Sequence, residues 1–151
     1  MTICVGLLVG CGPTTMGLSP SVPHALIVPA LDDEHNHGNP LGKFSALFIE
    51  SVNGKETVME YRSRQRNIPI GKVTLVVNEE YADDIQFVGE ITFDAKEGKK
   101  YILTSKHEKV GNRKVASELR VLNEKNKVIA RAKTKSIAIP PTMYVPVYIP
   151  M

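Results

Sequence analysis

The sequence predicts an all-β protein, a small antiparallel β-sandwich of about six or seven strands preceded by a disordered or extended N-terminal tether. Three observations predict this class. From Phe44 onward, apolar and polar residues alternate with the period of two that half-buried strands show. Turn signals recur about every ten residues. Prolines interrupt the segments on both sides of this region, which disfavours helices there.

The first predicted strand, residues 44–50, leads to Asn53-Gly54, a hairpin turn in which both residues accept positive φ. Beyond the turn, Thr57, Met59 and Tyr61 are expected to face inward. Two further inward rows follow at period two: Val73, Leu75 and Val77, then Phe87, Gly89, Ile91 and Phe93. Gly89 indicates a bulge or a close approach of two backbones.

Another strand is predicted over residues 99–105, whereas residues 115–133 allow two interpretations. The spacing of Val115, Leu119, Leu122 and Ile129 is roughly helical. Alternation over 128–133 and the loop-like residues 123–126 favour a hairpin instead, which we prefer. The apolar tail, residues 137–151, contains four prolines and is expected as an edge strand or a flexible extension.

Composition excludes several functional classes. The chain has 151 residues, with 19 basic and 16 acidic side chains interspersed, so one domain without a concentrated basic patch is expected. Trp is absent, which argues against a stacking platform for nucleic acid. Both cysteines, Cys4 and Cys11, lie in a stretch without charges that ends at Asp32. The remaining chain therefore has no disulfide, thiol nucleophile or cysteine-based metal site.

The apolar run over residues 3–10 ends in Leu8-Val9-Gly10-Cys11. This resembles the lipobox of bacterial lipoproteins, in which a small residue precedes the cleavage site and the cysteine thiol receives diacylglycerol. The resemblance implies a signal segment over 1–10 and lipidation of Cys11. Gly12 stands where an Asp often retains such proteins at the inner membrane, so the resemblance favours the outer membrane, with the domain facing the periplasm.

The signal segment departs from the usual pattern. Only Met1 and Thr2 precede the apolar run, whereas signal peptides have a basic start and about 15–30 residues. Either the start is misassigned or truncated, or these residues form a buried N-terminal strand with an incidental cysteine.

Residues 11–43 are predicted to form a lipidated, proline-rich linker. Its apolar stretch, residues 25–28, could lie on the domain as an edge strand. The linker also contains the only candidate metal ligands, Asp33, His35 and His37, although a polar, solvated loop is the preferred interpretation. No cofactor is predicted.

Residues 44–105 resemble the PEGA-like, transthyretin-like domains of envelope proteins. The resemblance rests on the Asn53-Gly54 turn, on Ile68-Pro69-Ile70-Gly71 leading into an apolar strand, and on Gly98 before Tyr101. Ile70 splits the Pro-Gly pair of that pattern. Such domains bind or space other molecules, and the resemblance supplies no catalytic residues.

The search for catalytic chemistry gives no site. His107 is adjacent to Glu108, but neighbours on a strand point to opposite faces, so a satisfied or solvated surface histidine is expected. A hydrolase would require His107 to meet a carboxylate and a nucleophile in one cleft. The basic cluster Arg62, Arg64 and Arg66 is expected in an exposed turn, with contact to acidic lipid headgroups as the alternative; Lys106, Lys109, Arg113 and Lys114 could extend it.

These observations predict a non-enzymatic, membrane-anchored envelope lipoprotein, an accessory domain over 44–136 that contacts another envelope protein or the envelope itself. The apolar tail is the reason to expect a protein partner, because exposed apolar surface often marks interaction sites. The alternative is a small-ligand or metal-binding periplasmic domain.

Overall fold

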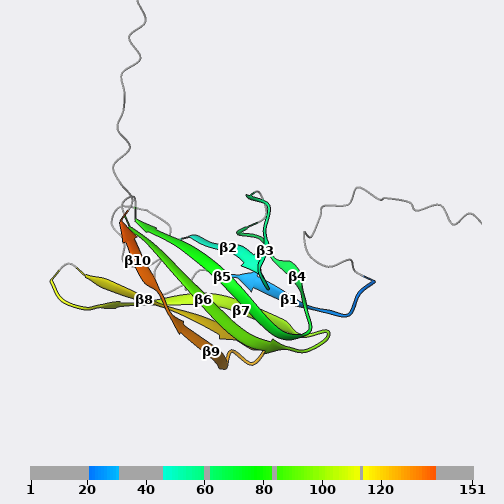
Figure 1. Cartoon of the computed structure of the whole chain (residues 1–151). Coiled ribbons are helices and arrows are strands. Elements are labelled where there is room, and N and C mark those ends of the chain that lie inside the picture. Colours follow the sequence, from blue (N-terminus) through cyan, green and yellow to red (C-terminus); the bar gives the residue numbers. More distant parts are fainter. Residues whose placement is uncertain (1–20, 31–45, 60–61, 83–84, 113, 139–151) are drawn as a thin grey trace, which may run out of the picture.

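The computed structural model describes residues 21–30, 46–59, 62–82, 85–112 and 114–138, and in them the chain forms two five-stranded sheets packed on one core (Figure 1). The predicted all-β sandwich is confirmed. The described residues form ten strands, more than the six or seven expected, because segments assigned to the linker, a turn and the tail also pair.

Sheet A has the strand order β4-β1-β7-β8-β9. Its strands are β1 (His24–Pro29), β4 (Arg66–Pro69), β7 (Lys100–Lys109), β8 (Val115–Leu122) and β9 (Val128–Lys133). All neighbours are antiparallel except β1 and β7, which run parallel.

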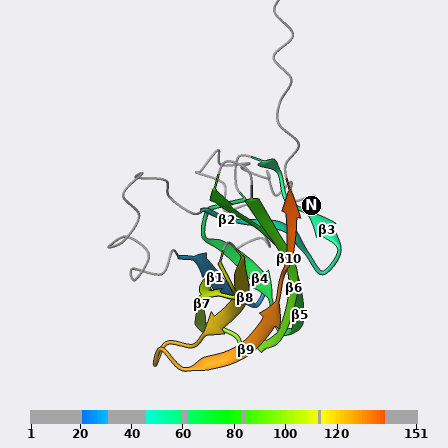
Figure 2. The same cartoon turned by 90° about the vertical axis from the view of Figure 1, so that its left-hand side faces the viewer.

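Sheet B has the order β10-β6-β5-β2-β3 and is antiparallel throughout. Its strands are β2 (Ala46–Val52), β3 (Lys55–Glu56), β5 (Gly71–Ala82), β6 (Ile85–Ala95) and β10 (Lys135–Ala138). Figure 2 shows how β9 continues into β10, so that the chain passes from sheet A to sheet B around Thr134.

The core consists of apolar side chains from the facing sides of both sheets. Its fully buried members include Ile27, Leu103, Leu119 and Val121 from sheet A and Ile49, Val73, Leu75, Val77 and Ile91 from sheet B. The predicted inward rows of β5 and β6 are confirmed. Burial of this apolar surface is the main stabilising term for such a domain.

The position of β1 differs from the prediction. Residues 25–28 were expected at a sheet edge, but β1 lies between β4 and β7 and buries Ala25 and Ile27. The apolar stretch indicated the strand, but it does not specify which strands pair with it. The sandwich therefore includes residues ahead of the expected boundary at residue 44.

The Asn53-Gly54 turn forms as predicted, with φ of 49° and 78°. The strand after it is shorter than expected, since β3 ends at Glu56. Thr57 is buried as predicted, but Met59 is 75% exposed, so the prediction for Met59 was wrong. Tyr61 lies outside the described residues. The chain leaves sheet B after β3, and the strand alternation no longer applies to Met59.

Residues 115–133 form the preferred hairpin, β8 and β9. Its loop is held by Asn123, whose Oδ1 accepts backbone N–H groups of Lys125 and Lys127 at 3.0 Å each. Gly89 marks a close approach: a Cβ there would lie 3.0 Å from Leu119 Cδ1 and 3.0 Å from Thr134 Cγ2.

Candidate functional site

Two polar sites stand out in the described residues, one buried between the sheets and one at the surface. The buried site, here called the Glu79 cluster, contains Glu79 of β5, Ser105 and His107 of β7, and Ser117 of β8. Glu79 is fully buried and reaches from sheet B to donors on sheet A.

Each donor of the Glu79 cluster contacts the carboxylate directly. The Ser105 hydroxyl donates to Oε1 and the Ser117 hydroxyl donates to Oε2, both at 2.6 Å. His107 Nε2 lies 2.7 Å from Oε1. A buried carboxylate is costly unless it is paired and hydrogen-bonded, and these three donors meet that requirement.

The charge of Glu79 is stabilised by its neighbours. Burial by itself raises the pKa of Glu79, but the hydrogen bonds from His107, Ser105 and Ser117, with the electrostatic attraction to His107, outweigh it. The net effect holds the pKa of Glu79 below its ordinary value. Glu79 is therefore an ionised acceptor between the sheets at neutral pH.

Aromatic rings enclose the histidine of the cluster. The His107 ring centroid lies 4.5 Å from that of Tyr81 and 5.9 Å from that of Phe87, and its side chain is only 5% exposed. The expectation of a surface position for His107 was therefore wrong, and of the two expected states, satisfied or solvated, the imidazole has the satisfied one through Glu79. Its partner carboxylate comes from the opposite sheet and not from the adjacent Glu108.

The period-two rows contained a signal for this cluster. Glu79 extends the inward row of Val73, Leu75 and Val77, and His107 extends the row of Tyr101, Leu103 and Ser105. Ser117 likewise precedes Leu119 and Val121. Reading each row beyond its apolar part would have placed all four polar side chains inside.

The geometry of the Glu79 cluster does not match a nucleophilic triad. In a triad the base accepts the proton of the nucleophilic hydroxyl, and a carboxylate orients that base. Here both serine hydroxyls donate to the carboxylate itself, and Ser105 and Ser117 are 3% and 5% exposed. The arrangement joins the two sheets.

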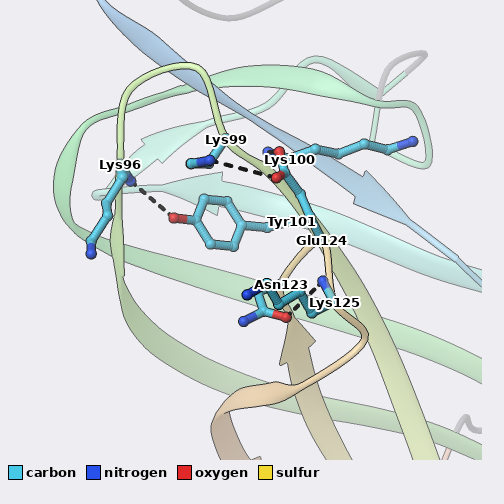
Figure 3. A network of polar contacts seen from close by, with 7 residues as sticks. All are labelled: Lys96, Lys99, Lys100, Tyr101, Asn123, Glu124 and Lys125. Carbon is cyan, nitrogen blue, oxygen red and sulfur yellow. Dashed lines mark hydrogen bonds and ion pairs between the residues drawn. The ribbon is translucent and has the colours of Figure 1, made fainter.

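The surface site, here called the lysine hollow, is a depression of about 470 Å³ between the turn that joins β6 to β7 and the loop that joins β8 to β9 (Figure 3). Phe93, Tyr101 and Ile129 contribute apolar surface to its lining. Four lysines against two carboxylates supply its charge: Lys96, Lys99, Lys100 and Lys125, with Asp94 and Glu124.

Backbone contacts fix the shape of the lysine hollow. The Lys96 N–H donates to Tyr101 Oη at 3.0 Å, and the Lys100 N–H donates to Glu124 Oε1 at 3.2 Å (Figure 3). Lys99 Nζ lies 3.7 Å from Glu124 Oε2. Glu124 thus connects the β8–β9 loop to the β6–β7 turn, and its charge is shared between Lys99 and a backbone amide.

The predicted arginine cluster is not one exposed basic patch. Arg62 Nη1 pairs with Glu50 Oε2 at 2.8 Å, while Arg66 is buried and donates to Thr57 Oγ1. Burial lowers the pKa of Arg66 to about 10, which leaves it charged at neutral pH. Of the positions expected to extend the patch, Lys106, Lys109 and Lys114 are exposed and Arg113 lies outside the described residues.

The remaining predicted site residues, Cys11, Asp33, His35 and His37, also lie outside the described residues. Within the described ranges, no group of three or more His, Cys, Asp or Glu side chains could hold a metal ion. No helix among those same residues is long and apolar enough to cross a membrane.

Comparison of the chain with protein-family models, with curated proteins and with solved structures found no significant match. The resemblances to the lipobox and to PEGA-like domains therefore stay predictions.

Proposed function

We propose that the protein is a lipid-anchored lipoprotein of the bacterial envelope, whose β-sandwich is a non-enzymatic accessory domain contacting another envelope protein or the envelope itself. The observation that carries the proposal is the lipobox Leu8-Val9-Gly10-Cys11. One acyl chain gives only marginal membrane binding, whereas two or more give stable anchoring. A diacylglycerol and an acyl chain on Cys11 would hold the domain at the bilayer.

The geometry of the Glu79 cluster supports the non-enzymatic part of the proposal. It is the arrangement in the described residues that comes nearest to a Ser-His-carboxylate site, and its hydroxyls are committed to Glu79. A substrate would have to reach serines buried between two sheets. A fluorophosphonate probe is therefore expected to leave the protein unlabelled, and covalent label on Ser105 or Ser117 would contradict this assignment.

The anchor is tested by the intact mass of the protein from a bacterial membrane fraction. We expect a chain that begins at Cys11 and carries a diacylglycerol and an acyl chain. Cys11→Ala should abolish this modification, and Cys4→Ala, the matched control at the other cysteine, should retain it. An unmodified wild-type chain that still begins near Met1 would overturn the proposal.

The alternative, a small-ligand or metal-binding periplasmic domain, has one observation in its favour. The lysine hollow has a volume within the range of small-molecule sites, about 300–1,000 Å³. The metal version depends on Asp33, His35 and His37, and an unchanged melting temperature with zinc, copper or calcium would exclude it.

A further inference from the structure

The start of β1 and the lysine hollow lie at the same end of the sandwich. The Gly98 N–H donates to the His24 carbonyl at 3.0 Å, and the Leu26 N–H donates to the Lys99 carbonyl at 2.9 Å. These bonds place the start of β1 beside the β6–β7 turn (Figure 1). Glu124 adds the β8–β9 loop to the same end. We call this region the lysine end.

The lysine end combines an excess of lysines over carboxylates with exposed apolar surface. Within the described part of the chain, the ammonium groups of Lys96, Lys100 and Lys125 have no ion pair. The described residues include seven exposed large apolar side chains, and three of them lie at this end: Val22 before β1, Ile70 in the β4–β5 turn, and Ile129 in the hollow.

The covalent path from the predicted lipid reaches the fold at this end. Ten residues lead from Cys11 to Ser21, the first described residue, and ten residues span at most about 36 Å when fully extended. The β7–β8 turn lies at the other end of β7 from the start of β1. The two are separated by the length of β7, which is ten residues or about 33 Å. A lipid on Cys11 therefore attaches the domain to the bilayer through the lysine end, and the opposite end is attached only through the length of the sandwich.

We propose that the lysine end is a membrane-contact surface, in which Lys96, Lys100 and Lys125 bind the phosphate groups of anionic phospholipids in the bilayer that holds the anchor. This inference rests on the proposed lipid anchor for its orientation. Lysine side chains place apolar stems along a surface and their charge toward polar headgroups, and exposed apolar neighbours fit the boundary between headgroups and acyl chains. Each lysine near such a surface strengthens binding by about fivefold.

The test uses the full chain carrying Cys11→Ala, so that no lipid anchor contributes. Co-sedimentation of the protein is measured with phosphatidylglycerol-containing vesicles and with pure phosphatidylcholine vesicles. Binding to the pure phosphatidylcholine vesicles measures the contribution of the apolar N-terminal run. We expect binding that depends on phosphatidylglycerol and weakens as salt rises. The variant K96Q/K100Q/K125Q should bind at least about tenfold more weakly.

The matched control is K106Q/K109Q/K114Q, which removes three exposed lysines near the opposite end of β7 and changes the net charge equally. It should bind almost as tightly as the parent. Equal loss in both triple variants would reduce the effect to net charge and overturn the proposal. Binding that does not depend on phosphatidylglycerol would also overturn the proposal. Displacement from the vesicles by inorganic phosphate at constant ionic strength would overturn it too, because it would indicate a site for a soluble anion.

Failure of this proposal is distinguishable from failure of the lipid anchor. Vesicle binding by the Cys11→Ala chain does not require lipidation, whereas the mass measurement does not require the lysines. In the lipidated protein on phosphatidylglycerol vesicles, acetic anhydride should modify Lys96, Lys100 and Lys125 more slowly than Lys106, Lys109 and Lys114. Equal rates at the two ends would contradict the predicted orientation.

Discussion

His107 Nε2 lies 2.7 Å from Glu79 Oε1, although the two side chains come from strands of opposite sheets. Both side chains are almost excluded from solvent, and Ser105 and Ser117 complete the coordination of the carboxylate. One ionised side chain of β5 thereby organises three donors from β7 and β8. The contact links the sheets through directional bonds as well as through the apolar core.

Replacing Glu79 should destabilise the fold strongly. Glu79→Ala leaves buried hydroxyls and an imidazole without their acceptor, and breaking a buried pair in this way costs about 3–5 kcal/mol. The free energy of unfolding, measured from urea denaturation, should fall by that amount. Glu80→Ala, on the exposed face of the same strand, should change it by less than about 0.5 kcal/mol. Similar losses for both variants would show that the Glu79 cluster has no special role.

The same cluster predicts how stability depends on pH. The pKa of Glu79 is lower in the folded protein than its ordinary value of 4.5, so the unfolded chain takes up this proton first as the pH falls. The stabilisation is fully present above about pH 4.5 and is lost as the pH falls toward the pKa of the folded state. Urea midpoints measured across the acid range should drop less steeply for Glu79→Gln than for the wild type. Parallel curves would contradict the lowered pKa.

Much of this fold could be predicted from the sequence because strand alternation is a local property. The rows of β5 and β6 and the β8–β9 hairpin follow from residue spacing and turn chemistry alone. The Glu79 cluster was missed because each inward row was followed only while its residues were apolar. The rows themselves extend to Glu79 and His107, so this part of the site was predictable in principle.

Other features depend on which strands become neighbours, which spacing does not determine. The parallel pairing of β1 with β7 joins segments separated by five strands, and it turned an expected edge strand into an inner one. The lysine hollow arises because the β6–β7 turn, which connects the two sheets, meets the loop of the β8–β9 hairpin through Glu124. Neither turn contains a recognisable binding motif by itself.

The Asn53-Gly54 turn should tolerate only residues that accept positive φ. Gly54 has a φ of 78°, and no atom lies within 4 Å of the position that a Cβ would occupy, so the cost of Gly54→Ala comes from backbone strain alone. We expect a loss of about 1–2 kcal/mol in the free energy of unfolding. Gly54→Asn should lose less, because Asn adopts this conformation more readily. Equal losses for Ala and Asn would point to a cause other than backbone conformation.

Gly89 should be intolerant of a side chain for a different reason, since its backbone is not in the positive-φ region and the surrounding space is filled. The Cβ of Gly89→Ala would lie 3.0 Å from both Leu119 Cδ1 and Thr134 Cγ2, and overpacking of this kind costs about 1–3 kcal/mol. Thr134→Ser removes the Cγ2 methyl and keeps the hydroxyl that donates to the Ser117 carbonyl at 2.7 Å. In a double-mutant cycle followed by urea denaturation, Gly89→Ala should therefore cost less in the Thr134→Ser background than in the wild type. An additive cycle would mean that the methyl of Thr134 does not limit the approach of β6 to the turn between β9 and β10.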